Sequence, residues 1–186
     1  MLSVGFALLA AMSFQLAAIN ASGAFLFVAA ACIQLRLLCN LMDGMMAIEH
    51  GLSSHTGALF NEIPDRVSDC LILIAAGWAV ALPGSVHLAY AAALFAVATA
   101  YLRLLGGSLG QAQSFDGPMA KQRRMDVLTL CALIDGFWCW FIPTLNNMPV
   151  LYLGLWVVML GSVVTCVRRI QMIESKLQPG QQEDHI

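Results

Sequence analysis

Residues 40–69 read NLMDGMMAIEHGLSSHTGALFNEIPDRVSD. This stretch sets Asp43, Asp65 and Asp69 within a chain that is otherwise mainly apolar. An ionisable side chain in a membrane segment is costly and rare, so it marks a candidate functional site. Because the three carboxylates lie at helical spacing and are flanked by glycines, they predict a site for a metal ion and a phosphate group at a membrane surface.

The composition of the whole chain explains why this stretch stands out. Of the 186 residues, 60% are hydrophobic and 11% are charged, and the mean hydropathy is +0.78. Soluble domains contain about 25% charged residues, so the composition predicts a polytopic integral membrane protein. The formal net charge of −2 carries little information, and we expect no nucleic-acid partner.

Six apolar runs predict the fold. A run of about 20 residues is long enough to cross a bilayer as an α-helix, so we expect an all-α bundle of six transmembrane helices. They form one domain over residues 1–172, followed by a short polar tail over residues 173–186. The expected spans are residues 2–19, 24–48, 58–82, 86–105, 125–143 and 149–168.

The positive charges predict the orientation of the bundle. The three turns on one side of the membrane carry none of the nine Lys and Arg residues. By the positive-inside rule, the carboxylates and both termini face the cytoplasm, as in a bacterial inner-membrane protein. Arg103, Lys121, Arg123 and Arg124 flank the loop between the fourth and fifth spans. They are candidates for holding a lipid phosphate, and plain topology signals are the alternative.

Helical periodicity predicts two polar faces. Residues at i, i+3, i+4 and i+7 share one side of a helix. If the second and third spans pack as antiparallel neighbours, these faces meet. Arg66 lies about 100° round the helix from Asp65, so it is expected to point elsewhere. The two faces consist of Asn40, Asp43, Gly44 and Ala47 on the second span, and Gly57, Asn61, Asp65 and Asp69 on the third.

The chemistry of these side chains predicts the ligand. Carboxylate and amide oxygens suit hard cations such as Mg²⁺, Mn²⁺ or Ca²⁺. A divalent ion at a membrane surface typically serves phosphate chemistry, because it neutralises the charge of a phosphoryl group during transfer.

The spacing resembles the motif of the CDP-alcohol phosphatidyltransferases, D-x2-D-G-x2-A-R-x8-G-x3-D-x3-D. The match has no gaps, and together with the six-span layout it covers nearly the whole chain. The matching residues are Asp43, Gly44, Ala47, Gly57 and Asp65. The chain departs from the motif at Asn40 and Asn61, where the family has Asp, and at Ile48, where the family has Arg.

The resemblance implies a reaction. Family members use a divalent metal pair, Mg²⁺ or Mn²⁺, to hold the pyrophosphate of a CDP-linked lipid or alcohol. An acceptor hydroxyl attacks the phosphate attached to the alcohol group, and CMP leaves. The resemblance also implies a homodimer within the membrane lipids.

The resemblance also implies roles for individual residues. Asn40, Asp43 and Asn61 occupy metal-binding positions. Asp65 occupies the position of a residue that both contacts metal and acts as general base. The residues implied to contact the cytidine nucleotide are Gly44, Ala47 and Gly57.

The two asparagines have a physical consequence. Asn keeps a neutral carbonyl oxygen but removes a full negative charge. Two such exchanges predict weaker binding of divalent ions, or a single bound ion. Asp69 lies one helical turn beyond Asp65 and is a candidate auxiliary acid.

Alternatives to an active enzyme remain open. The asparagines also suit a pseudoenzyme that binds a nucleotide-lipid without turnover. A small transporter is the third reading, although its carboxylates would be expected nearer the middle of the bilayer. Asp135, midway along the fifth span, is expected to pair across the bundle or at a dimer interface. The acceptor alcohol is not specified by any residue pattern.

Overall fold

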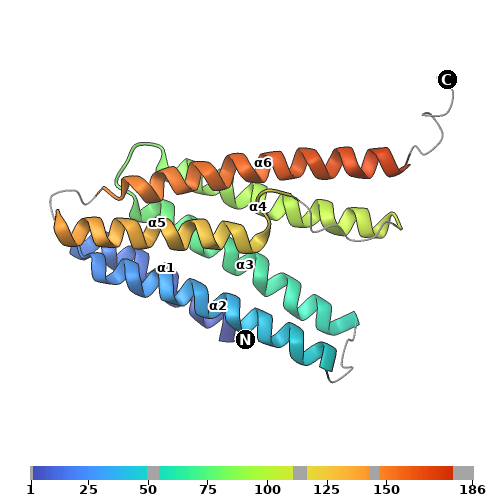
Figure 1. The fold of residues 1–186 in the computed structure, drawn as a ribbon, viewed down its shortest axis with the longest axis horizontal. Coiled ribbons are helices and arrows are strands. Elements are labelled where there is room, and N and C mark those ends of the chain that lie inside the picture. Colours follow the sequence, from blue (N-terminus) through green and yellow to red (C-terminus); the bar gives the residue numbers. More distant parts are fainter. Residues whose placement is uncertain (1, 50–54, 111–116, 143–146, 178–186) are drawn as a thin grey trace.

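The computed structural model describes residues 2–49, 55–110, 117–142 and 147–177, without the side chains of residues 44, 46–49 and 55–61. Within these ranges the chain forms six α-helices and no strand, which confirms the predicted all-α fold (Figure 1). The helices are α1 (Leu2–Asn20), α2 (Gly23–Glu49), α3 (His55–Ala79), α4 (Ser85–Ser108), α5 (Lys121–Phe141) and α6 (Pro149–Leu177).

Four helices differ from the predicted spans by three or more residues at the end that carries the charged residues. One of them, α4, continues to Ser108 rather than ending at residue 105. Helix α3 begins at His55 and contains Pro64, which directly precedes Asp65. Helix α5 begins at Lys121 rather than at residue 125, so the basic residues before the span are helical. Helix α6 continues to Leu177. At 1.5 Å per residue it is about 43 Å long, so it extends beyond a hydrocarbon core of about 30 Å.

The helices are arranged as a closed circuit. In the described part of the chain, α1 packs against α2 and α3, and α2 packs against α5. Helix α5 packs against α6, α6 against α4, and α4 against α3. Helix α1 therefore lies between α2 and α3 along much of the bundle, so the two motif helices are not simple antiparallel neighbours. Periodicity could not reveal this, because it predicts which face is buried and not which helix covers it.

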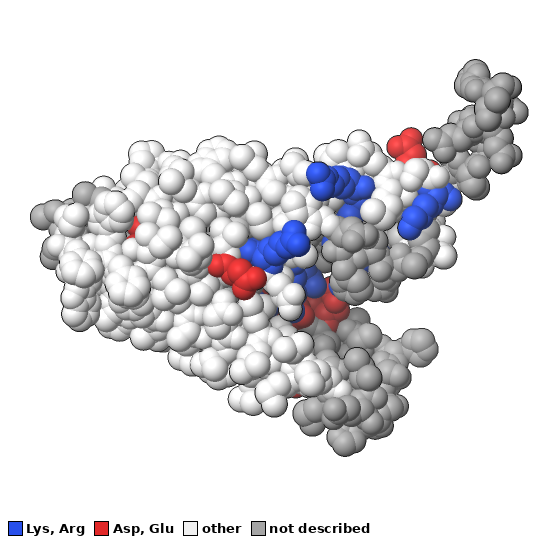
Figure 2. All heavy atoms as spheres, viewed as in Figure 1, with Lys and Arg blue, Asp and Glu red and all other residues white. Residues whose placement is uncertain are grey.

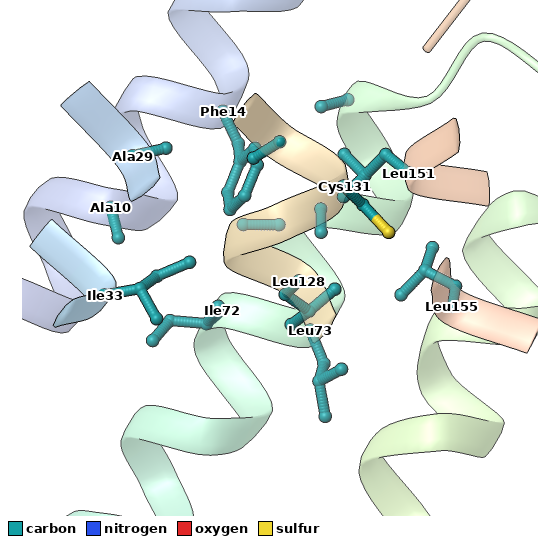
Figure 3. Close-up of a cluster of buried hydrophobic side chains, with 14 of the residues drawn as sticks. Ala10, Phe14, Ala29, Ile33, Ile72, Leu73, Leu128, Cys131, Leu151 and Leu155 are labelled. Atoms are coloured by element: carbon teal, nitrogen blue, oxygen red, sulfur yellow. The ribbon is translucent and has the colours of Figure 1, made fainter. Parts of the chain in front are cut away.

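The core is apolar and draws on most of the bundle. Phe14, Ile33, Ile72, Leu128 and Leu155 are fully buried and come from five different helices. Figure 3 shows these side chains pointing toward one another. Small residues occupy the contacts of α4, where a row of buried alanines allows close helix packing.

The outer surface is apolar as well. Large side chains such as Leu94, Trp140 and Phe141 are exposed by 68%, 70% and 77%. Helices α1, α2, α4 and α6 are each long and apolar enough to cross a membrane. The buried acids of the described chain, Asp65, Asp69 and Asp135, lie on α3 and α5, and these two helices also carry several cations. The protein is therefore a multi-pass membrane protein whose apolar surface faces lipid.

Asp135 stabilises the end of the bundle opposite the charged residues. It lies on α5 and is 1% exposed. Its carboxylate accepts hydrogen bonds from the backbone N–H groups of Val150 (3.3 Å) and Leu151 (2.6 Å) in the first turn of α6. These are donors that a helix leaves unsatisfied at its start. The predicted pairing across the bundle is therefore a cap supplied by a neighbouring helix.

We expect Gly77→Ala to destabilise the bundle by about 1–3 kcal/mol, because overpacking a tight contact shifts backbone and side chains. An added Cβ at Gly77 would overlap the Cβ of Ala89 and lie 2.9 Å from the carbonyl oxygen of Ser85. The measurement is the melting temperature of purified protein in detergent. Gly5→Ala is the control, since nothing lies within 4 Å of its added Cβ. Equal melting of both variants would contradict this packing.

Candidate functional site

Charged side chains gather in one half of the molecule. Figure 2 shows them around a hollow between the ends of the helices, whereas the other half is almost entirely uncharged. The hollow corresponds to a pocket of about 1050 Å³. Its described lining contains no Asp or Glu, so it is suited to an anionic ligand. The cations that line it are Arg66, Arg103, Lys121, Arg123, Arg124, Arg168 and Arg169.

Asp65 lies beside this pocket and is held from two other helices. It is 9% exposed. Asn40 of α2 donates from Nδ2 to Asp65 Oδ1 at 2.7 Å, and Lys121 of α5 donates from Nζ to Asp65 Oδ2. Arg36 Nη2 lies 3.5 Å from Oδ1 and donates to the backbone oxygen of Asp65 at 3.1 Å. The structure thus brings Asn40 and Asp65 together, as the motif faces predicted.

Lys121 is fixed at the start of α5 and is partly buried. Burial lowers the pKa of its ammonium group, while the hydrogen bond and the negative charge of Asp65 act in the opposite direction. Among the described residues Asp65 is its hydrogen-bond partner. Lys121 was predicted to hold a lipid phosphate, and it does line the pocket. Its contact with the expected general base was not predicted.

Asp69 lies one turn deeper and is 1% exposed. Its Oδ1 is 2.7 Å from Arg36 Nη2, an ion pair whose geometry falls outside that of a hydrogen bond. Its Oδ2 accepts a hydrogen bond from Arg124 Nη2 at 3.2 Å and lies 3.8 Å from Arg66 Nη1. Because three guanidinium groups surround this carboxylate, it anchors arginines at the pocket. A role as auxiliary acid stays a prediction.

Arg124 and Arg169 converge on one residue of α4. Arg124 Nη1 donates to Thr99 Oγ1 at 3.1 Å and to the carbonyl oxygen of Met119 at 3.0 Å. Arg169 of α6 donates to the carbonyl oxygen of Thr99. Both guanidinium groups are buried yet line the pocket. Thr99 thus helps to position both side chains at the pocket, together with Asp69 in the case of Arg124.

Glu62 holds two further cations at the pocket. Its Oε1 lies 2.7 Å from Arg103 Nη2 and 2.7 Å from Arg66 Nη2. Arg66 forms no ion pair with Asp65 among the described residues, as its position on the helix predicts, but its side chain lines the pocket and reaches Glu62 and Asp69. Glu62 lies four residues before Arg66 and Asp69 three residues after it, so both are neighbours on its own face of α3.

The remaining motif residues are only partly described. Asp43 is exposed on α2, one turn beyond Asn40, and forms no ion pair in the described part of the chain. The pocket lining includes Asn40 but not Asp43. The side chains of Asn61 and Ala47, and the surroundings of Gly44 and Gly57, lie outside the described residues.

The donors present fit a hard cation in kind. Asn40, Asp43 and Asp65 offer carbonyl and carboxylate oxygens, which Mg²⁺ and Mn²⁺ prefer. These donors carry less negative charge than the family motif, however, because Asn40 and Asn61 stand where the motif has Asp. Across the ranges described, no three His, Cys, Asp or Glu side chains are grouped as a metal centre.

Sequence reasoning missed the contributions of Arg36, Arg168 and Arg169. Arg36 is fully buried at the centre of the carboxylate network. One signal was available, since Arg36 lies about one helical turn before Asn40 and inside an apolar span. Arg168 and Arg169 follow the expected end of the sixth span, where cations are common topology signals, so nothing in the pattern distinguished them.

Comparison with known proteins identifies similar chains. No family model matches the sequence. The phosphatidylinositol phosphate synthase of Streptomyces avermitilis is 28% identical over 142 residues, which cover 74% of this chain and 57% of that protein. The enzyme of the same name from Mycobacterium tuberculosis (strain H37Rv) is 24% identical over 151 residues, covering 80% and 67%. The chain thus spans little more than half the length of the first relative.

Solved structures of the Mycobacterium tuberculosis phosphatidylinositol phosphate synthase PgsA1 share the fold. The complex with manganese and citrate has a TM-score of 0.71 at 23% identity, covering 93% of this chain and 77% of that one. The structure with CDP-DAG bound has a TM-score of 0.66 at 21% identity, covering 92% and 85%. The curated relatives and these structures together confirm the resemblance to the CDP-alcohol phosphatidyltransferases.

We expect Asp69→Asn to destabilise the protein by about 3–5 kcal/mol, because removing one partner of a buried ionic network leaves charges uncompensated. Arg36 and Arg124 would lose their shared counter-charge. The measurement is thermal unfolding in detergent. Asp126→Asn is the matched control, since Asp126 is exposed on α5 and forms no ion pair among the described residues. If the two variants have the same melting temperature, Asp69 does not anchor the surrounding arginine side chains.

Proposed function

We propose that the chain is a membrane transferase that moves a phosphatidyl or phospho-alcohol group from a CDP-alcohol, most simply CDP-diacylglycerol, to an acceptor hydroxyl. CMP is the second product. The observation that carries the proposal is the contact of Asn40 with Asp65 beside a pocket lined by cations. Similarity to phosphatidylinositol phosphate synthases, one of them solved with CDP-DAG, supports the same chemistry.

In the proposed reaction the acceptor oxygen forms a bond to the phosphorus that bears the alcohol group, and the bond to the CMP oxygen breaks. Asp65 takes the proton of the acceptor hydroxyl, which is the role of a general base. Asn40 and Arg36 orient its carboxylate. The surrounding guanidinium groups stabilise the negative charge that develops on the phosphates.

A divalent ion, Mg²⁺ or Mn²⁺, would neutralise the pyrophosphate and favour departure of CMP. The motif assigns this ion to Asn40, Asp43, Asn61 and Asp65, all of which have oxygen donors of the kind that it prefers. Manganese in the Mycobacterium tuberculosis structure supports this cofactor. Gly44, Ala47 and Gly57 would approach the nucleotide, as the motif implies.

We propose further that the acceptor itself carries a phosphate. Arg168, Arg169 and Arg103 line the side of the pocket formed by α4 and α6, away from Asn40. A guanidinium group recognises phosphate through paired hydrogen bonds. Arg169 is buried and Arg103 also pairs with Glu62, and a phosphate on the acceptor would add negative charge beside these cations, an attraction that a neutral alcohol lacks. The name of the relatives, which includes an inositol phosphate product, supports an acceptor of this class.

We propose that the site faces the cytoplasm. The pocket is lined by seven Lys and Arg residues, and the positive charges visible in Figure 2 gather at this end of the bundle, in agreement with the positive-inside rule. The homodimer implied by the resemblance stays a prediction.

A second candidate is binding of a CDP-lipid without turnover. The observation that favours it is the occupation of Asp65 by Lys121, Asn40 and Arg36, which leaves little capacity to take a proton. Restoring the motif with Asn40→Asp and Asn61→Asp separates the candidates. CMP release that appears only in the double variant supports the pseudoenzyme.

We expect Asp65→Asn to lower CMP release by about 100-fold or more, because general-base catalysis contributes about 10²–10⁴-fold. The assay uses purified protein in detergent with CDP-diacylglycerol, Mn²⁺ and a panel of phosphorylated and free alcohols. Asp126→Asn is the control for loss of a carboxylate outside the pocket. Undiminished release by the Asp65 variant would rule this residue out as the base.

We expect Arg168→Gln to raise the KM for a phosphorylated acceptor by about tenfold, the effect of losing one charge-assisted hydrogen bond. The measurement compares initial rates with glycerol 3-phosphate and glycerol, or inositol phosphate and inositol. Lys176→Gln is the matched control, since Lys176 lies on the same helix but does not line the pocket. A preference for the unphosphorylated alcohols would exclude a phosphate-bearing acceptor.

A further inference from the structure

We propose that Lys121 is the resident counter-cation of Asp65, so that this site binds a single divalent ion per chain. The inference rests on the proposed function and concerns how that site is neutralised. It is based on the ion pairs of the three acids near the pocket. Asp65 and Asp69 each pair with cations, whereas Asp43 forms no ion pair among the described residues.

The carboxylate of Asp65 is already well occupied. Lys121 Nζ donates to Oδ2, while Oδ1 accepts from Asn40 Nδ2 at 2.7 Å and lies 3.5 Å from Arg36 Nη2. A carboxylate offers about four lone-pair positions. An ion that coordinated Asp65 directly would have to displace an ammonium or an amide from a largely buried oxygen.

The surrounding charge argues against a second ion at this point. Asp65 and Asp69 share Arg36, and Asp69 also pairs with Arg124. With Lys121, and with Arg66 at 3.8 Å from Asp69 Oδ2, four cations therefore face two buried carboxylates. A divalent cation added beside Asp65 would meet like charges at close range, where the interaction is weakly screened. In addition, neither Asn40 nor Asn61 supplies the negative charge that the family motif has at those positions.

Asp43 differs from Asp65 in its surroundings. It is exposed, and no described cation forms an ion pair with it. Asn40 lies one turn earlier on the same helix, and its amide nitrogen is engaged by Asp65. Its carbonyl oxygen is therefore directed away from Asp65 and remains a possible metal donor. The acid that keeps its charge available for one divalent ion is Asp43.

The backbone before Lys121 is anchored to the opposite side of the pocket. Met119 is 7% exposed, and its N–H donates to Thr165 Oγ1 of α6 at 3.1 Å. Arg124, one turn into α5, donates back to the carbonyl oxygen of Met119. The first residue of α5 is thus held where its side chain reaches Asp65, so the lysine is a built component of the site and not a mobile surface cation.

The experiment is a titration of the purified protein with Mn²⁺ in the presence of CDP, with free Mn²⁺ followed by electron paramagnetic resonance. No turnover is needed. The wild-type chain is expected to bind one equivalent. Lys121→Met frees Asp65 from the ammonium, so we expect at least fivefold tighter binding or a second equivalent. Lys121→Arg keeps the charge and is expected to retain one equivalent.

Arg123→Met is the matched control, because Arg123 also lines the pocket but donates only to the carbonyl oxygen of Pro118 among the described residues. Equal tightening by this variant would assign the effect to the general potential of the pocket and overturn the proposal. No bound Mn²⁺, two equivalents in the wild type, or unchanged binding by Lys121→Met would also overturn it. Absence of CMP release by the wild type would instead refute the transferase activity, since the titration is independent of turnover.

Discussion

The structure depends on the neutralisation of two buried carboxylates on α3. Asp65 and Asp69 lie at one end of an apolar bundle, where an uncompensated charge would be strongly unfavourable. Their partners come from α2 and α5, and Arg66 comes from α3 itself. The two acids therefore hold together helices that are far apart in sequence. The same pairing gathers the cations that make the pocket attractive to phosphate.

The polar contacts of Asp65 join helices that the circular arrangement would otherwise keep apart. Helix α1 separates α2 and α3 over much of the bundle, yet Arg36 and Asn40 reach across to Asp65 at the charged end. Helix α5 contacts α2 and delivers Lys121 to the same carboxylate. The site thus forms where three helices approach, and α4 and α6 close the pocket with Thr99 and Arg169.

Much of the fold could be predicted from the sequence, because lipid imposes a simple rule on length and polarity. The six apolar runs became six helices, and the motif spacing correctly placed Asn40 near Asp65. The order of the helices around the bundle could not be predicted, because periodicity shows which face of a helix is buried but not which helix packs against it. Nor could the contacts of Lys121 and Arg169 be predicted, because cations at the ends of spans look alike whether they mark topology or line a site.

Asp135 has a consequence for how the chain enters the membrane. It lies on α5 about two turns before the helix ends at Phe141, and its hydrogen-bond donors belong to the first turn of α6. Until α6 is in place, α5 would expose an unsatisfied acid to hydrocarbon. The two helices are therefore suited to integrate as a hairpin, with the later segment completing the solvation of the earlier one. Biogenesis of the C-terminal third would then be a paired event and not a helix-by-helix one.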